Sequence, residues 1–157
     1  MKRVSLFGCI ATATLLFTLT AQAQNGAEER GYWRAASNTA RNITGDVTLG
    51  SEKLTLNFWT TPISRAREIT GSELSAVFDT DSNPARTGSL YRLSIPGARK
   101  FLHKNSLCGT EDVQWMVAYA QGNSLQLAFF SGDKPPVLTF DALNDSTDKC
   151  GTFTYVK

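Results

Sequence analysis

The side chains able to carry out nucleophilic or metal chemistry are few in this sequence. The chain contains one histidine, His103, and three cysteines, Cys9, Cys108 and Cys150. Ser106 lies three residues after His103, so a histidine-activated serine is a nucleophile that the spacing suggests. The Gly-x-Ser-x-Gly motif that often presents such a serine does not occur. We therefore predict that His103 is a surface-loop residue, that the chain has no catalytic residues and that the protein is not an enzyme.

Residues 79–83, DTDSN, are similar to the first half of a calcium-binding loop. In such a loop the next residue is a glycine and an acidic residue closes the ligand set. Here those positions hold Pro84 and Leu90. The sequence therefore favours an Asp/Asn/Pro turn between two elements over an ion site, and we predict no metal and no cofactor.

The first 23 residues have the three parts of a secretory signal peptide: a basic start, an apolar run over residues 4–20 and the site Ala21-Gln22-Ala23. We predict cleavage after Ala23, a mature chain that begins at Gln24, and a periplasmic or secreted location. A retained membrane anchor is the alternative. The apolar run is near the lower length limit for a spanning helix, and four threonines dilute it.

Export decides how the remaining cysteines are interpreted. A zinc site needs more ligands than Cys108, Cys150 and His103 supply, and a redox pair would normally read Cys-x-x-Cys. Two cysteines in an oxidising compartment are instead expected to pair. We predict a structural disulfide, Cys108–Cys150, which closes a loop of roughly 43 residues and stabilises the fold by about 4 kcal/mol in the chain-entropy model.

Signal removal also changes the charge. The chain has 16 Lys and Arg and 14 Asp and Glu residues, and Lys2 and Arg3 leave with the signal, so residues 24–157 carry equal numbers of both. A neutral domain has no broad positive field to hold nucleic acid or an anionic membrane. We therefore predict no nucleic-acid partner and no stable membrane insertion after signal removal.

Beyond a polar segment at 24–31, which we predict to be a flexible N-terminal arm, residues 32–157 are long enough for a single domain. Period-two alternation of apolar residues predicts short strands. The segments with this pattern are 46–50, 53–59, 72–80, 89–95, 113–132 and 150–156, with a further strand around Trp33.

Particular alternations define the predicted faces. Leu54, Leu56 and Phe58 share one side, and Leu74, Ala76 and Phe78 share another. Segment 113–132 predicts a hairpin, because Gly122-Asn123 separates two alternating runs.

No segment keeps a helical period. The longest candidate, residues 61–74, has irregular apolar spacing and is interrupted by Pro62 and Gly71, so only a short helical turn is expected there. The fold class that follows is all-β: a small antiparallel β-barrel or sandwich of about seven to eight strands with one disulfide.

The segments ITGDV (43–47), LYRL (90–93), LCG (107–109), FFSG (129–132) and CGTFTY (150–155) resemble a recurring pattern in an uncharacterised family of small exported proteobacterial proteins. The resemblance implies export and a small β domain, but it does not imply a role for any particular residue. In size and strand pattern the chain is also similar to periplasmic lysozyme inhibitors, which are small disulfide-bearing β-barrels. That similarity is architectural and implies no function by itself.

One loop has the composition of a binding surface. A basic stretch with two apolar residues in its middle comes shortly before Cys108. We predict that the following residues contact a partner: Arg99, Lys100, Phe101, His103 and Lys104. The alternative is a solvated loop whose two apolar residues pack on the barrel end. The prolines of GDKPPV (132–137) suggest a second, rigid binding ridge.

We therefore expect an exported, non-enzymatic binding or inhibitory protein of the bacterial envelope that recognises a protein or glycan through barrel-end loops. The alternative is a lipocalin-like carrier of a small apolar ligand, which requires a hollow barrel. Aromatic residues would line such a hollow, although in strands they more often form core: Trp59, Tyr91, Trp115 and Phe130.

Overall fold

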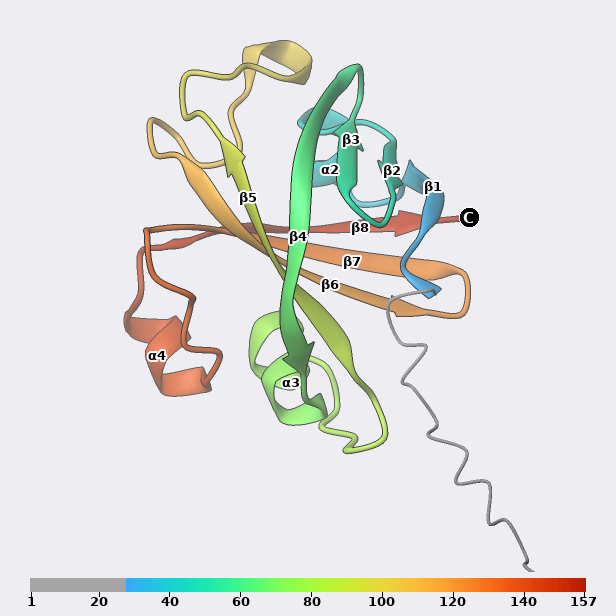
Figure 1. Ribbon diagram of the computed structural model, residues 1–157, viewed down its shortest axis with the longest axis vertical. Helices are drawn as coiled ribbons and strands as arrows, with labels where there is room; N and C mark the ends of the chain where they lie inside the picture. Colours follow the sequence, from blue (N-terminus) through green and yellow to red (C-terminus); the bar gives the residue numbers. More distant parts are fainter. Residues whose placement is uncertain (1–27) are drawn as a thin grey trace, which may run out of the picture.

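The computed structural model describes residues 28–157, which form a closed antiparallel barrel (Figure 1). Each strand pairs with the next in sequence, and the last pairs with the first. The strands are β1 (Gly31–Ala35), β2 (Val47–Leu49), β3 (Lys53–Leu56), β4 (Trp59–Ile69), β5 (Gly88–Ile95), β6 (Val113–Gln121), β7 (Ser124–Ser131) and β8 (Lys149–Val156). This confirms the all-β prediction and selects the barrel over the sandwich. The signal peptide predicted at 1–23 lies outside the described residues.

Large side chains fill the barrel interior. Alternate residues of the strands point inward, as the period of two requires. Trp33, Phe129, Phe153 and Tyr155 are each at most 1% exposed and belong to one apolar cluster with inward-facing leucines. Tyr91 also faces this cluster, as the alternation in segment 89–95 predicts.

A second apolar cluster lies outside the barrel wall. Trp115, Val117 and Phe130 point outward from β6 and β7, and they are buried because two helices cover them. These helices are α3 (Gly71–Phe78) and α4 (Phe140–Asp145), which Figure 1 shows beside each other below the strands. Strand β6 is therefore apolar on both faces. Of the four aromatic residues considered for a ligand pocket, Tyr91, Trp115 and Phe130 are core residues.

The strand predicted over residues 72–80 is wrong, because most of that segment is helix α3. The Thr70 side chain accepts a hydrogen bond from the backbone of Glu73, and the Glu73 side chain accepts one from the backbone of Thr70. This reciprocal capping box satisfies two backbone donors that would otherwise have no partner at the helix start. Leu74 and Val77 then pack on the outer cluster.

The structure also corrects the alternation predicted for residues 53–59. Leu54 and Leu56 are fully buried, but Phe58 is 96% exposed. Leu56 pairs with Trp59, so Asn57 and Phe58 form a two-residue turn. Asn57 adopts a left-handed conformation with φ of 55°, which asparagine tolerates better than most residues. The strand therefore ends at Leu56, and the alternation does not extend to Phe58.

The N-terminal segment predicted as a flexible arm is partly described. Glu29 is buried and Gly31 begins β1. The Trp33 indole donates a hydrogen bond to the Glu29 carbonyl at 3.0 Å. Residues 29–31 are therefore part of the barrel end rather than a loose extension.

The disulfide prediction is confirmed: Cys108 and Cys150 are bonded, with Cα atoms 4.8 Å apart. The bond joins the β5–β6 loop to the start of β8. Within residues 28–157, no helix is long and apolar enough to cross a membrane.

Candidate functional site

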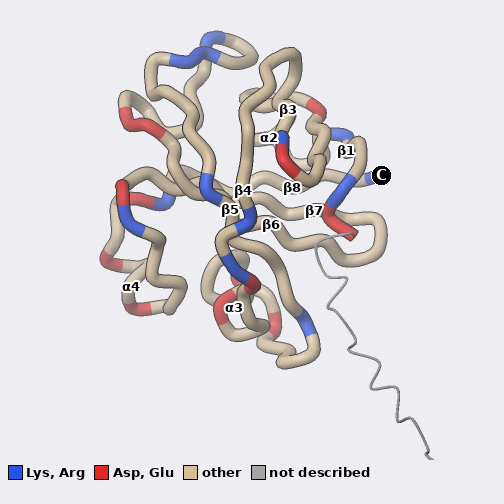
Figure 2. The backbone as a smooth tube through the Cα atoms, in the orientation of Figure 1, with Lys and Arg blue, Asp and Glu red and all other residues tan. Residues whose placement is uncertain are grey.

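Four connections meet at one end of the barrel. They are residues 36–46, which contain the short helix α2 (Asn38–Asn42), the Asn57-Phe58 turn, and two long loops. We refer to residues 96–112 as the basic loop and to residues 132–148 as the acidic loop. Figure 2 shows Lys and Arg on the basic loop and Asp around α4 in the acidic loop.

The two sides of the basic loop are in close contact at its base. A Cβ atom on Gly97 would lie 2.1 Å from the carbonyl oxygen of Thr110, so only glycine allows this approach. The Gly97 backbone N–H donates to the Asp112 carboxylate at 2.8 Å. Leu107 is buried, and Cys108 beside it is bonded to Cys150. The base is therefore closed by a covalent bond, a backbone contact and an apolar anchor.

The tip of the basic loop is attached to the connection that contains α2. The Leu102 backbone N–H donates to the Ile43 carbonyl at 3.0 Å, and the Asn105 side chain donates to the Asn42 carbonyl at 2.9 Å. Between these contacts lies the 3₁₀ turn η1 (Leu102–Lys104). These bonds hold the tip in a single position against its neighbour.

The turn at the tip contains two residues in a strained backbone conformation. His103 and Lys104 have φ of 54° and 62°, in the left-handed region that favours glycine. Such a conformation in residues with a Cβ atom persists only where surrounding contacts enforce it. Both side chains point to solvent, so their strain is not relieved by burial.

An aromatic residue from β4 contacts the Arg99 side chain. The Arg99 guanidinium lies 5.1 Å from the centre of the Trp59 ring, within range of a cation–π interaction. Phe101 packs edge-on against the same ring, with 6.1 Å between ring centres. The preceding residue, Phe58, exposes nearly its whole ring.

The structure thus brings the predicted partner-binding residues together on one loop. Arg99, Lys100, His103 and Lys104 are exposed, and Phe101 is half-buried against Trp59. Sequence reasoning assigned Phe58 to a strand face and did not connect it with this loop. An Asn-Phe pair at the end of an alternating run was the available signal for a turn.

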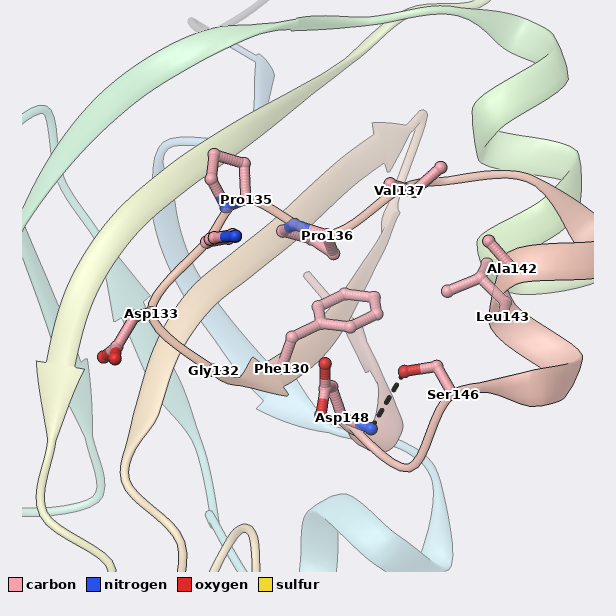
Figure 3. Close-up of a pocket in the computed structure, with 11 residues that line it drawn as sticks. Phe130, Gly132, Asp133, Pro135, Pro136, Val137, Ala142, Leu143, Ser146 and Asp148 are labelled. Atoms are coloured by element: carbon pink, nitrogen blue, oxygen red, sulfur yellow. Dashed lines mark hydrogen bonds between the residues drawn. The ribbon is translucent and has the colours of Figure 1, made fainter.

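A groove of about 480 Å³ lies under the acidic loop (Figure 3). Phe130 lies beneath Pro135 and Pro136, and Leu143 of α4 lies on the far side. The prolines proposed as a binding ridge therefore form the wall of a groove. Leu138, which is buried, attaches the loop to the outer cluster of the barrel.

One rim of this groove is part of a polar network. The Gln114 side chain donates to the Asp133 carboxylate at 2.8 Å and accepts a hydrogen bond from Arg92. The Arg92 guanidinium lies 4.7 Å from the centre of the Trp115 ring. This network fixes the start of the acidic loop to the outer face of β5 and β6.

A buried carboxyl group lies at the opposite end of the barrel. Glu29 is 1% exposed, and the Tyr91 hydroxyl donates to its Oε2 at 2.8 Å. Its Oε1 has no hydrogen-bond partner within residues 28–157. Burial raises the pKa of Glu29 from 4.5 to about 7, although the Tyr91 bond and the charge of Arg65 act in the opposite direction. Burial beside this carboxyl also raises the pKa of Tyr91 to about 12.

The segment considered as a calcium loop forms a turn. Asn83 Oδ1 accepts a hydrogen bond from the backbone of Ala85 at 2.9 Å, and Asp79 ends helix α3 with a left-handed φ of 54°. No cluster of three or more His, Cys, Asp or Glu side chains suited to a metal ion occurs between residues 28 and 157.

No family model, curated protein or solved structure matches this chain.

Proposed function

We propose that this chain is an exported, non-enzymatic binding protein of the bacterial envelope, and that its basic loop and Phe58 recognise an acidic protein partner. The observation that carries the proposal is the exposed Phe58 ring next to Trp59, on which the Arg99 cation of the basic loop stacks. Aromatic and basic residues at the centre of an interface commonly supply most of its binding energy.

Rigidity supports this role. The disulfide, the Gly97 contact and the hydrogen bonds to Ile43 and Asn42 order the loop before any partner arrives. A preordered loop loses less conformational entropy on binding than a mobile one. The stacking of Arg99 on Trp59 leaves Lys100, His103 and Lys104 free to face a partner.

The packing of the barrel also favours recognition by loops over carriage of a ligand. A carrier needs interior volume that side chains leave empty. Here Trp33, Phe129, Phe153 and Tyr155 occupy the interior with essentially no exposure. An acidic partner fits the loop because Arg99, Lys100 and Lys104 are exposed toward its tip, whereas its acidic residues, Glu111 and Asp112, lie at its base.

Site-specific photocrosslinking in cells that produce the protein tests this proposal. A benzophenone amino acid at position 58 is expected to crosslink one envelope protein, and the same group at Asn123, at the opposite barrel end, is not. Lys100→Ala with Lys104→Ala is expected to reduce the crosslink about tenfold, since each exposed charge contributes up to about 1 kcal/mol.

Arg30→Ala with Lys53→Ala is the matched control, because it removes two exposed charges at the other end of the barrel. This control is expected to crosslink as the parent does. Equal crosslinking from positions 58 and 123, or no loss in the Lys100/Lys104 variant, would contradict the proposal.

A further inference from the structure

The groove under the acidic loop has no part in the proposed function, although its volume is in the range of small-ligand sites. Its walls are Pro135, Pro136 and Leu143, and the buried Phe130 ring lies beneath them (Figure 3). Proline restricts the backbone φ angle, so this wall keeps its shape without a ligand. The groove therefore offers a preformed slot whose lining is apolar in part and polar in part.

A carboxylate stands at the edge of that slot. The backbone of Asp148 is held on both sides: its N–H donates to the Ser146 hydroxyl at 3.0 Å, and its carbonyl accepts from Ser131 at 2.8 Å. Its side chain is exposed, and among residues 28–157 no hydrogen bond or ion pair to the carboxylate is found. Figure 3 shows this carboxylate next to the Phe130 ring.

The charges around the groove favour a cation. The acidic loop has one basic residue, Lys134, and four acidic ones, Asp133, Asp141, Asp145 and Asp148. Of those that line the groove, Asp133 already accepts a hydrogen bond from Gln114. Asp148 is therefore the carboxylate available to a ligand. With Lys134 also at the groove, its lining carries a net charge of one negative unit, which one positive charge neutralises.

We propose that this groove binds an organic cation, namely a primary ammonium or guanidinium group on an apolar chain of a few carbons. The cation pairs with the Asp148 carboxylate in a charge-assisted hydrogen bond. The chain packs against Pro135, Pro136 and Leu143, where its burial is favourable.

Titration of the oxidised protein followed by ¹H–¹⁵N NMR spectra tests the site. The probes are n-pentylammonium and 1-pentanol, which share the chain and differ in the charge. Pentylammonium is expected to shift the amide signals of Gly132, Leu143 and Asp148 in a saturable manner. Its affinity is expected to exceed that of pentanol about tenfold or more, as for a hydrogen bond to a charged group. Equal affinities, or shifts spread over the whole barrel, would overturn the proposal.

Variants locate the charge that matters. Asp148→Asn retains both backbone hydrogen bonds and is expected to weaken pentylammonium binding about tenfold. Asp145→Asn removes the same charge from an exposed residue that does not line the groove, and it is expected to change binding less than twofold. Equal effects of the two variants would show that general charge attraction, and not this site, binds the cation.

The source of the cation is decided by two further probes, a capped Ala-Lys-Ala peptide and its Ala-Met-Ala analogue. Tighter binding of the lysine peptide than of pentylammonium identifies a protein side chain as the ligand, and weaker binding identifies a free amine. Either result supports the site. Equal binding of the lysine and methionine peptides would contradict it. The basic loop is unchanged in these variants, so failure here leaves the crosslinking result at Phe58 intact.

Discussion

The basic loop and the acidic loop leave the same end of the barrel, yet different interactions hold them in place. A disulfide and backbone hydrogen bonds fasten the basic loop at its base and tip. The acidic loop is attached by Leu138 and Leu143, which pack on the outer face of the barrel, and by hydrogen bonds at Asp133 and Asp148. The disulfide and hydrogen bonds fix the base and tip of the first loop, whereas a groove lies beneath the second.

The two loops also differ in charge. The basic loop contains Arg99, Lys100 and Lys104 toward its tip and Glu111 and Asp112 at its base, and the acidic loop has four acidic residues and one lysine. A chain that is nearly neutral overall therefore carries two oppositely charged surfaces on one end. Net charge describes long-range fields, but recognition depends on where the charges lie. The disulfide joins the loop of one sign to the strand that follows the loop of the other.

The largest expected effect comes from removing this shared bond. Cys108→Ser with Cys150→Ser is expected to lower the free energy of unfolding by about 2–5 kcal/mol, measured by urea denaturation. If the comparison holds, crosslinking at Phe58 should fall in this variant, because the basic loop loses its covalent base. Pentylammonium binding should persist, because apolar packing holds the acidic loop. If a folded variant lost both the crosslink at Phe58 and pentylammonium binding, the two loops would not differ in their dependence on the disulfide.

The next effect separates the exposed charges of the loops from the buried carboxyl group of Glu29. The pKa of Glu29 is about 7 in the folded protein and near 4.5 when the group is solvated. Between these values the folded state holds a proton that the unfolded state has lost. The free energy of unfolding is therefore expected to fall as pH rises from 4.5 to 7, by up to about 3 kcal/mol, and to level off above pH 7.

Urea denaturation at pH 5 and pH 8 measures this change. Glu29→Gln, which keeps an acceptor for the Tyr91 hydroxyl, is expected to show a much smaller difference between the two pH values. Parallel pH dependence in the parent and the variant would assign the effect to other groups, the exposed loop charges included.

The smallest effect tests the strain in the loops. Lys104 of the basic loop is left-handed, whereas the left-handed position of the acidic loop is occupied by Gly132, with φ of 88°. Lys104→Gly is expected to raise the free energy of unfolding by about 1 kcal/mol, and Gly132→Ala is expected to lower it by about the same amount. Thermal denaturation of both variants measures the pair. A shift of the same sign in both would show that strain does not distinguish the loops.

Local patterns in the sequence were sufficient for the all-β class and the disulfide, but not for the choice of a barrel over a sandwich. They also missed strand β4 (Trp59–Ile69), since only a short helical turn was expected over residues 61–74. Alternation in segments such as 89–95 places Tyr91, Leu93 and Ile95 inside, because strand side chains point to opposite faces whatever surrounds them. Two cysteines beyond the predicted signal leave a single pairing, Cys108–Cys150. The basic stretch from Arg99 to Lys104 was visible as a candidate surface for the same reason, since charged residues seldom lie in a core.

Only the tertiary structure decided which apolar faces are inside the barrel and which lie under helices. Leu74, Ala76 and Phe78 alternate as a strand would, yet the Thr70–Glu73 capping box and the outer cluster on β6 and β7 stabilise a helix there. Short apolar runs fit both periods, so burial against a partner surface selects between them. The exposure of Phe58, the burial of Glu29 and the groove beside Asp148 likewise depend on segments distant in sequence, which alternation along a single strand does not encode.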